Sequence, residues 1–175
     1  MKKYLASSFL IEPSSIDESI YENDDPIIMS QNTAKAKGEL VYKRHPNDTI
    51  ISADTIVVIN KKILGKPKDI EDAFNMIKSL AGNTHEVITS YFIKNKDHER
   101  LESVVSKVKL KQVNKDVIRK YINDYPPLDK AGSYGIQDEY FSENILDSYE
   151  GSLTNIIGLP IEKIIDDLRE FSIIS

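Results

Sequence analysis

The sequence predicts a layered α/β domain. Short runs dense in β-branched residues, typical of buried strands, alternate along the chain with amphipathic segments of helical spacing. The length of 175 residues suits one domain with a substantial core and leaves little room for two. We therefore expect a single domain over 1–175, in which strands and helices intermix in layers.

The first predicted strand begins at Tyr4 and ends in two small hydroxyl residues, Ser7 and Ser8. In α/β domains such a strand end usually continues into a phosphate-binding turn and a helix. Here a second apolar run begins directly at Phe9, so the turn and the helix have no room. Two parallel strands need a crossover of about a dozen residues, and none is present at this point.

The later elements follow from apolar periodicity and from Pro, Gly and Asn residues at their ends. The acidic stretch 17–25 indicates a loop, and 95–100 indicates a polar connection between two paired strands. Residues 151–159 could be a capped helix start. The predicted elements, in order, are a helix over roughly 27–44, a strand over 49–59, turns at 60–62 and 64–67, a helix from Asp69 to Gly82, strands at 84–94 and 102–112, a short helix from Asn114 to about Asn123, a short strand at 145–149 and a last helix from Pro160.

Composition excludes several classes of function. The balance of 23 basic to 28 acidic residues gives a net charge of −5, which argues against a general nucleic-acid binder. The absence of cysteine excludes disulfides and thiolate metal sites and agrees with a reducing cytoplasm. No apolar stretch approaches a membrane span, and the start of the chain does not read as a secretory signal. A small anionic ligand remains compatible, because a few converging lysines can create a local positive site.

Asp54 is the strongest chemical signal, because it interrupts the apolar run from Ile50 to Ile59. An ionised carboxylate is costly to bury without a partner. One interpretation is a functional acid at a cleft, which holds a metal or activates water. The other is a strand-end carboxylate that caps a backbone or pairs with a lysine. The run alone does not decide between them.

Other candidate residues give weaker signals. Lys66 lies in a Gly-Pro turn, and the stretch 129–137 combines two glycines, a lysine, hydroxyls and a glutamine amide. Such a loop could meet phosphates and read a base edge, although one Gly-rich loop is weak support. The acids Asp17 and Glu18 more often form a solvated face, but one or the other could help to hold a hard cation. The three histidines lack metal-ligand spacing.

Taken in order, these segments resemble the Maf family, which is named for septum-formation inhibition. The resemblance covers nearly the whole chain, and the ordered set is far more specific than any one motif. Its motifs are "LAS" at 5–7, "IDES" at 16–19, "AKAKG" at 34–38, "SADTIVVI" at 52–59, "ILGKP" at 63–67, "SLAGNTHEVIT" at 79–89, "LDKAGSYGIQ" at 128–137 and "EGSLTNIIGLP" at 150–160.

The resemblance implies an elongated, two-lobed, Maf/ITPase-like α/β fold, with a mixed sheet flanked by helices and a nucleotide cleft between the lobes. It implies a house-cleaning nucleoside triphosphate pyrophosphatase, which uses a divalent cation, Mg²⁺ or Mn²⁺, to release pyrophosphate and a monophosphate. It allows a homodimer. The aspartate–threonine pair looks like the subgroup acting on dTTP and UTP.

The resemblance also assigns roles to residues by matching position. Asp54 would be the general base, and Thr55 and Gln137 match positions tied to base choice. Other site positions are matched by Ser7, Ser8, Glu18, Lys37, Lys66 and Lys130, with Glu18 and Asp54 as the metal ligands.

The chain departs from the family between Ser8 and Phe9. Family members usually continue from "LAS" into a Ser-Pro-Arg-Arg turn and a helix, so two phosphate-binding arginines are missing. Either the natural protein carries this stretch, or the shortening is genuine and the protein is a weakened enzyme or a nucleotide-binding relic.

Two rival functions therefore stay open. The first is a non-catalytic nucleotide-binding or cell-division regulatory protein, which a genuine shortening would favour. The second is a house-cleaning pyrophosphatase for modified purines with a similar fold.

Overall fold

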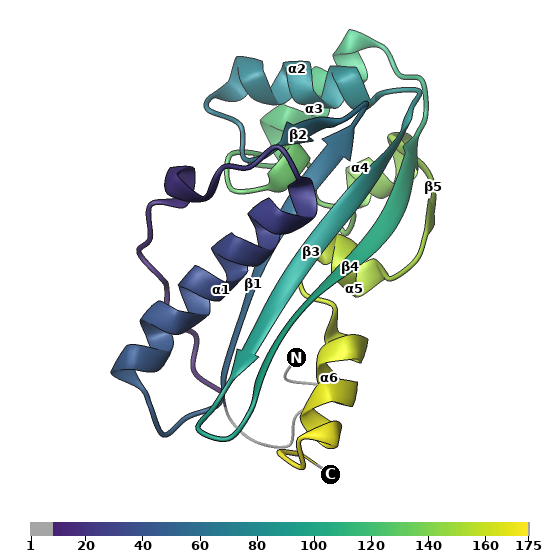
Figure 1. Ribbon diagram of the computed structural model, residues 1–175. Coiled ribbons are helices and arrows are strands. Elements are labelled where there is room, and N and C mark those ends of the chain that lie inside the picture. Colours follow the sequence, from purple (N-terminus) through teal and green to yellow (C-terminus); the bar gives the residue numbers. More distant parts are fainter. Residues whose placement is uncertain (1–8, 175) are drawn as a thin grey trace.

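The fold is built on a five-stranded sheet of order β2-β1-β3-β4-β5, seen in a computed structural model that describes residues 9–174 (Figure 1). Every ladder between these strands is antiparallel. The strands are β1 (Ile50–Ile59), β2 (Lys62–Leu64), β3 (Thr84–Lys94), β4 (Glu99–Leu110) and β5 (Leu146–Glu150). The predicted first strand and the Ser8–Phe9 junction lie outside the described residues, so the parallel pairing of a mixed sheet stays a prediction.

Helices cover both faces of the sheet, which confirms the predicted α/β class. The long helix α1 (Pro26–Arg44) lies along one face, and the shorter helices lie on the other (Figure 1). None of the helices in residues 9–174 is both long and apolar enough to span a bilayer. The shorter elements are η1 (Glu18–Tyr21), α2 (Ile70–Leu80), α3 (Lys115–Asp124), η2 (Ala131–Ser133), α4 (Glu139–Asn144), α5 (Leu153–Ile157) and α6 (Ile161–Glu170).

Most predicted elements are confirmed, and the errors fall on the shortest ones. The turns expected at 60–62 and 64–67 flank a short strand, β2, which forms a tight hairpin with β1. Helix α4 was not predicted, because its six residues bury only Phe141 and leave no periodic signal. The predicted acidic loop contains the single turn η1. Strand β4 begins at Glu99, before the predicted start, because it continues the ladder opposite Lys94.

Two hydrophobic clusters lie on the face of the sheet opposite α1. The larger cluster packs α2, α3 and α4 against one end of the strands, and the smaller one packs α6 against the other end. Between them lies a row of buried polar side chains that includes Thr89, Ser106 and Asn155. The two lobes, a nucleotide cleft between them and a single domain over 1–175 stay predictions.

Helix α1 contacts the sheet through small and polar residues. Its buried positions are Ser30, Thr33, Ala34 and Gly38. Ser30 Oγ lies 2.6 Å from Ser90 Oγ on β3, and the Ala34 carbonyl accepts a 2.7 Å hydrogen bond from Ser52 on β1. A backbone with so few large side chains can approach the sheet closely.

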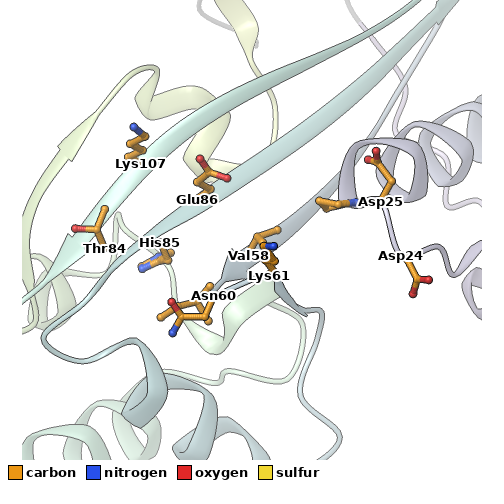
Figure 2. Close-up of a pocket in the computed structure, with 11 residues that line it drawn as sticks. Asp24, Asp25, Val58, Asn60, Lys61, Thr84, His85, Glu86 and Lys107 are labelled. Atoms are coloured by element: carbon orange, nitrogen blue, oxygen red, sulfur yellow. The ribbon is translucent and has the colours of Figure 1, made fainter.

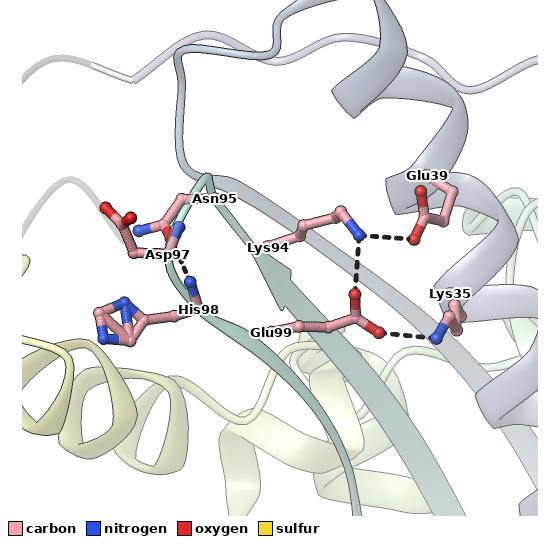
Figure 3. Close-up of polar contacts among 7 residues, drawn as sticks. All are labelled: Lys35, Glu39, Lys94, Asn95, Asp97, His98 and Glu99. Carbon is pink, nitrogen blue, oxygen red and sulfur yellow. Dashed lines mark hydrogen bonds and ion pairs between the residues drawn. The ribbon is translucent and has the colours of Figure 1, made fainter.

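Ion pairs at the end where β3 passes into β4 also attach α1 to the sheet. Figure 3 shows Lys94 on β3 between Glu39 of α1, at 2.9 Å, and Glu99 of β4, at 2.7 Å. Lys35 of α1 also contacts Glu99, at 2.6 Å. The side chains of these pairs are partly exposed, so each pair contributes about 1 kcal/mol or less.

Gly38 is the position where α1 comes closest to the sheet. A Cβ atom there would lie 2.5 Å from the Phe92 ring and 2.6 Å from Ser52 Oγ. Phe92 is fully buried and has no room to move aside. We expect Gly38→Ala to lower the free energy of unfolding by about 1–3 kcal/mol, despite the better helix propensity of alanine. Denaturant unfolding measures this change.

Gly65→Ala is the matched control, because no atom lies within 4 Å of a Cβ at that position. Equal stabilities of the two variants would show that α1 does not need the glycine.

His85 is a buried structural residue. Its Nε2 lies 2.7 Å from the Tyr134 hydroxyl, and its Nδ1 is buried without a partner among the described residues. Burial lowers the pKa of His85 from 6.5 to about 4. The neutral form is therefore the one that fits the folded protein.

This burial predicts a pH dependence of stability. The pKa of His85 is lower in the folded protein than in the unfolded chain. The contribution of neutral His85 to the free energy of unfolding is therefore complete above pH 6.5, and about 3 kcal/mol of it is lost as the pH falls toward 4. We expect His85→Leu to remove most of this loss in unfolding measured between pH 4 and 6.5. His45→Gln, at a half-exposed position, should keep it; a wild-type-like loss in His85→Leu would contradict the assignment.

Candidate active site

Asp54 lies in the middle of β1 and faces α1. Its side chain is 10% exposed, and its Oδ1 accepts a 2.7 Å hydrogen bond from Lys37 Nζ on α1. Burial raises the pKa of Asp54, and the charge and hydrogen bond of Lys37 offset this only in part. The carboxylate is thus paired, but it holds a proton more readily than an exposed aspartate does.

Lys37 is shared between two carboxylates. Its Nζ also lies 2.9 Å from Glu18 Oε1, which comes from the single turn η1. Burial tends to lower the pKa of Lys37, but Asp54 and Glu18 together raise it. Partial burial tends to raise the pKa of Glu18, but Lys37 lowers it below the ordinary value. At neutral pH this is one ammonium bridging two acids.

The turn η1 brings Glu18 into this cluster through a cap of its own. Asp17 is the N-cap: its Oδ1 accepts hydrogen bonds from the backbone N–H of Ser19 at 3.1 Å and from its hydroxyl at 2.7 Å. The two acids that the sequence left as alternatives therefore have different roles. Asp17 shapes the turn, and Glu18 points to Lys37.

Lys66 adds a second positive charge to the cluster. It lies in the exposed turn after β2, and its charge lowers the pKa of Glu18 and opposes the rise at Asp54. The carbonyl of Gly65 accepts a 3.0 Å hydrogen bond from Gly132 N–H, which attaches the 130–137 loop to this turn. The structure thus brings together Glu18, Lys37, Asp54 and Lys66.

Lys130 and Gln137 have no direct contact with this cluster in the described structure. Lys130 Nζ lies 2.8 Å from Asp138 Oδ2, which also accepts a 2.6 Å hydrogen bond from Tyr121. Gln137 is exposed at the surface of the same loop. Their predicted substrate contacts stay predictions, as do those of Ser7 and Ser8, which lie outside the described residues.

Thr55 faces the side of the sheet opposite Asp54, because successive strand residues alternate. Its Oγ1 lies 2.9 Å from Thr89 Oγ1 on β3, and Thr89 in turn donates to the main-chain carbonyl of Asn155. Sequence reasoning missed Thr89 and Asn155. The signal was available, since Thr89 is a hydroxyl residue inside the apolar run of β3.

The donor set of the cluster fits a divalent cation. No group of three or more metal-ligating side chains occurs in residues 9–174. Mg²⁺, however, typically takes one or two carboxylates and completes its shell with phosphate oxygens and water. Asp54 and Glu18 are two hard oxygen donors that already converge on one cation, the Lys37 ammonium.

A pocket of about 740 Å³ lies elsewhere, at the start of α1 and the adjoining ends of β1 and β3 (Figure 2). Its lining includes Asp25, Lys61, His85, Glu86 and Lys107, and none of the predicted site residues. Its acids and bases are mixed, with no converging positive charge for a polyphosphate. We therefore assign the candidate active site to the Asp54 cluster and not to this pocket.

Comparison with known families matches residues 1–171 to the family described as Maf-like protein. The chain belongs to the Maf family. The resemblance inferred from the ordered motifs is thereby confirmed.

Relatives in this Maf family are similar over most of their length and are named dTTP/UTP pyrophosphatase. The protein of Pyrococcus furiosus is 43% identical, over 89% of this chain and 81% of its own length. The protein of Thermosipho africanus is 41% identical, over 95% of this chain and 84% of its own length. The protein of Clostridium botulinum is 42% identical, over 95% of this chain and 89% of its own length.

The shared ammonium of this Maf chain predicts an energetic coupling. Lys37→Met leaves two acids without their common partner, and we expect it to lower the free energy of unfolding by about 2 kcal/mol. This loss is smaller than for a fully buried ion pair, because the Glu18 side chain is 45% exposed. Adding Asp54→Asn should recover part of this loss in a double-mutant cycle. Unfolding at neutral pH measures both changes.

Lys35→Met is the matched control on the same helix. Lys35 pairs with Glu99, but both side chains are about two-fifths exposed, so we expect a loss of about 0.5 kcal/mol. Strict additivity of Lys37→Met and Asp54→Asn would show that the two side chains are not coupled.

Proposed function

We propose that the chain is a nucleoside triphosphate pyrophosphatase that hydrolyses dTTP and UTP to the monophosphate and pyrophosphate. The observation that carries this proposal is the cluster of Glu18, Lys37, Asp54 and Lys66 in a family whose similar members are named dTTP/UTP pyrophosphatase. The arrangement supplies both things that cleavage of a polyphosphate needs: a base for water and positive charge for phosphate oxygens.

Asp54 is the proposed general base. Lys37 occupies its Oδ1, and no described residue hydrogen-bonds to Oδ2, which leaves that oxygen to accept a proton from the attacking water. Burial raises the pKa of Asp54 toward the pH at which the enzyme works, which favours general-base catalysis. Proton transfer of this kind contributes about 10²–10⁴-fold to a rate.

The lysines are proposed to bind phosphate oxygens. An ammonium has three N–H donors, and Lys37 uses two of them on Asp54 and Glu18, so one remains for the substrate. Lys66 extends from an exposed turn and can follow the substrate. Ser7, Ser8, Lys130 and Gln137 are proposed as further substrate contacts, and Thr55 as a contact to the base. If the shortening between Ser8 and Phe9 is genuine, the absent arginines would reduce phosphate binding relative to other family members.

Asp54 and Glu18 are the proposed ligands of Mg²⁺ or Mn²⁺. When bound, such an ion neutralises phosphate charge and acidifies water. The chain's own residues would still position the phosphates and accept the proton.

We place the enzyme in the cytoplasm as a single domain over 1–175, with a nucleoside triphosphate in a cleft between two lobes. The lack of cysteine and the net charge of −5 support a reducing compartment and the absence of a nucleic-acid partner. A homodimer stays a prediction.

Pyrophosphate release from a nucleotide panel with Mg²⁺ or Mn²⁺ tests the proposal. We expect UTP and dTTP to be turned over faster than ITP and methylated GTP, which would exclude the purine rival. Asp54→Asn should lower kcat by about 10²-fold or more, because it removes the base. Asp124→Asn, at a surface pair with Lys120, is the control and should leave kcat unchanged.

A thermal-shift measurement separates catalysis from binding. Nucleotide should still raise the Tm of Asp54→Asn, since ligand binding stabilises the folded state. Equal turnover by wild type and Asp54→Asn would remove Asp54 from the mechanism. A nucleotide-dependent shift without turnover by the wild type would favour the non-catalytic rival.

A further inference from the structure

A chain of hydrogen bonds runs from Thr55 through Thr89 to α5. Thr55 and Thr89 are directly opposite each other on β1 and β3, and their hydroxyl oxygens are 2.9 Å apart. Thr89 Oγ1 lies 2.9 Å from the main-chain carbonyl oxygen of Asn155. Thr89 and Asn155 are fully buried in the polar row between the two hydrophobic clusters.

This chain has a fixed direction. A carbonyl oxygen can only accept, so Thr89 must donate its single hydroxyl proton to Asn155. Thr89 then has no proton left for Thr55 and can only accept from it. The proton of Thr55 is therefore directed at Thr89, and Thr55 Oγ1 can offer only its lone pairs to any other group.

The carbonyl that sets this direction is held in place. The Asn155 side-chain amide donates to the Val87 carbonyl at 3.2 Å and to Ser106 Oγ at 2.8 Å, so α5 is attached to both β3 and β4. The backbone N–H of Asn155 also donates to the side-chain oxygen of the N-cap residue Ser152, at 3.1 Å. Reversal of the hydrogen-bond chain would require α5 to leave the sheet.

Gly158 keeps space beside the Thr55 hydroxyl. It ends α5 with φ +110°, and a Cβ atom there would lie 3.3 Å from Thr55 Oγ1. Because glycine has no side chain, nothing from this residue covers the Thr55 lone pairs. Thr55 itself is half-buried and not sealed.

We propose that Thr89 is a positioning residue that makes Thr55 Oγ1 a hydrogen-bond acceptor, matched to the imide N3–H of uracil and thymine. Cytosine presents a lone pair at N3, which would meet the Thr55 lone pairs and be rejected. The inference rests on the proposed function and concerns the choice between pyrimidines of the same size. It adds Thr89 and the Asn155 carbonyl to the determinants of specificity.

The test compares Thr89→Val with Thr89→Ser. Valine keeps the shape but removes the oxygen, so the Thr55 proton becomes free to meet the cytosine N3. We expect the ratio of kcat/KM for UTP over CTP to fall about tenfold in Thr89→Val, the size of one hydrogen bond exchanged for a mismatch. Thr89→Ser keeps the hydroxyl and should keep the wild-type ratio.

The ratio separates a specificity role from a structural one. A loss of packing alone would lower turnover of UTP and CTP equally, and it would show as a lower Tm with an unchanged ratio, which would overturn the proposal. Thr84→Val, at the far end of the same strand, controls for a general effect of removing a threonine hydroxyl from β3.

A second measurement needs no variant. The wild type should turn over UTP about tenfold or more faster than 3-methyl-UTP, which lacks the N3–H. Equal turnover of these two nucleotides would overturn the proposal even if Thr89→Val does not fold.

Failure of the proposed function gives a different result, which is no turnover of any nucleotide by the wild type. Calorimetric affinities for UTP, CTP and 3-methyl-UTP then replace kcat/KM under the same criteria, so the inference is still decided.

Discussion

The close approach of α1 to the sheet is the constraint on which the candidate site depends. Ala34 and Gly38 leave no large side chain between the helix and β1, and Ser52 on β1 hydrogen-bonds directly to the helix backbone. Lys37, next to Gly38, is thereby held where its ammonium meets Asp54. A helix attached by large apolar residues would lie farther out and would leave Asp54 buried without a partner.

The electrostatics of the site follow from this geometry. A buried aspartate in an apolar strand is unfavourable, and one lysine shared with Glu18 compensates for only part of the cost. In the proposed mechanism this remaining imbalance serves catalysis, because it leaves a carboxylate that accepts protons more readily than an exposed aspartate does. Binding an anionic substrate and a cation would replace a costly arrangement of the free protein with a better compensated one.

The sequence predicted the elements that carry the site better than the contacts within it. The range of α1 followed from the acidic loop that leads to Pro26, and the range of β1 followed from its density of β-branched residues. The family resemblance grouped Lys37, Asp54 and Lys66. The pairing of Lys130 with Asp138 could not be read from the sequence, because it depends on Tyr121, which a separate helix brings to the same carboxylate.

Two short elements were missed for a similar reason. Strand β2 and helix α4 are too short to carry a periodic pattern, and tertiary contacts rather than propensity determine them.

The alternation of β1 gives the site its organisation. Asp54 and Thr55 are adjacent in sequence, yet one faces α1 and the other faces α5 across the thickness of the sheet. In the described structure, β3 pairs with residues 50–58 on one side of β1, while β2 covers only residues 57–59 on the other side, so a ligand that met both side chains would have to approach β1 from the side of β2. Lys66 emerges from the turn on this same side. In the proposed mechanism, a single strand thus holds the general base on one face and the recognition hydroxyl on the other, and each face is set by its own helix.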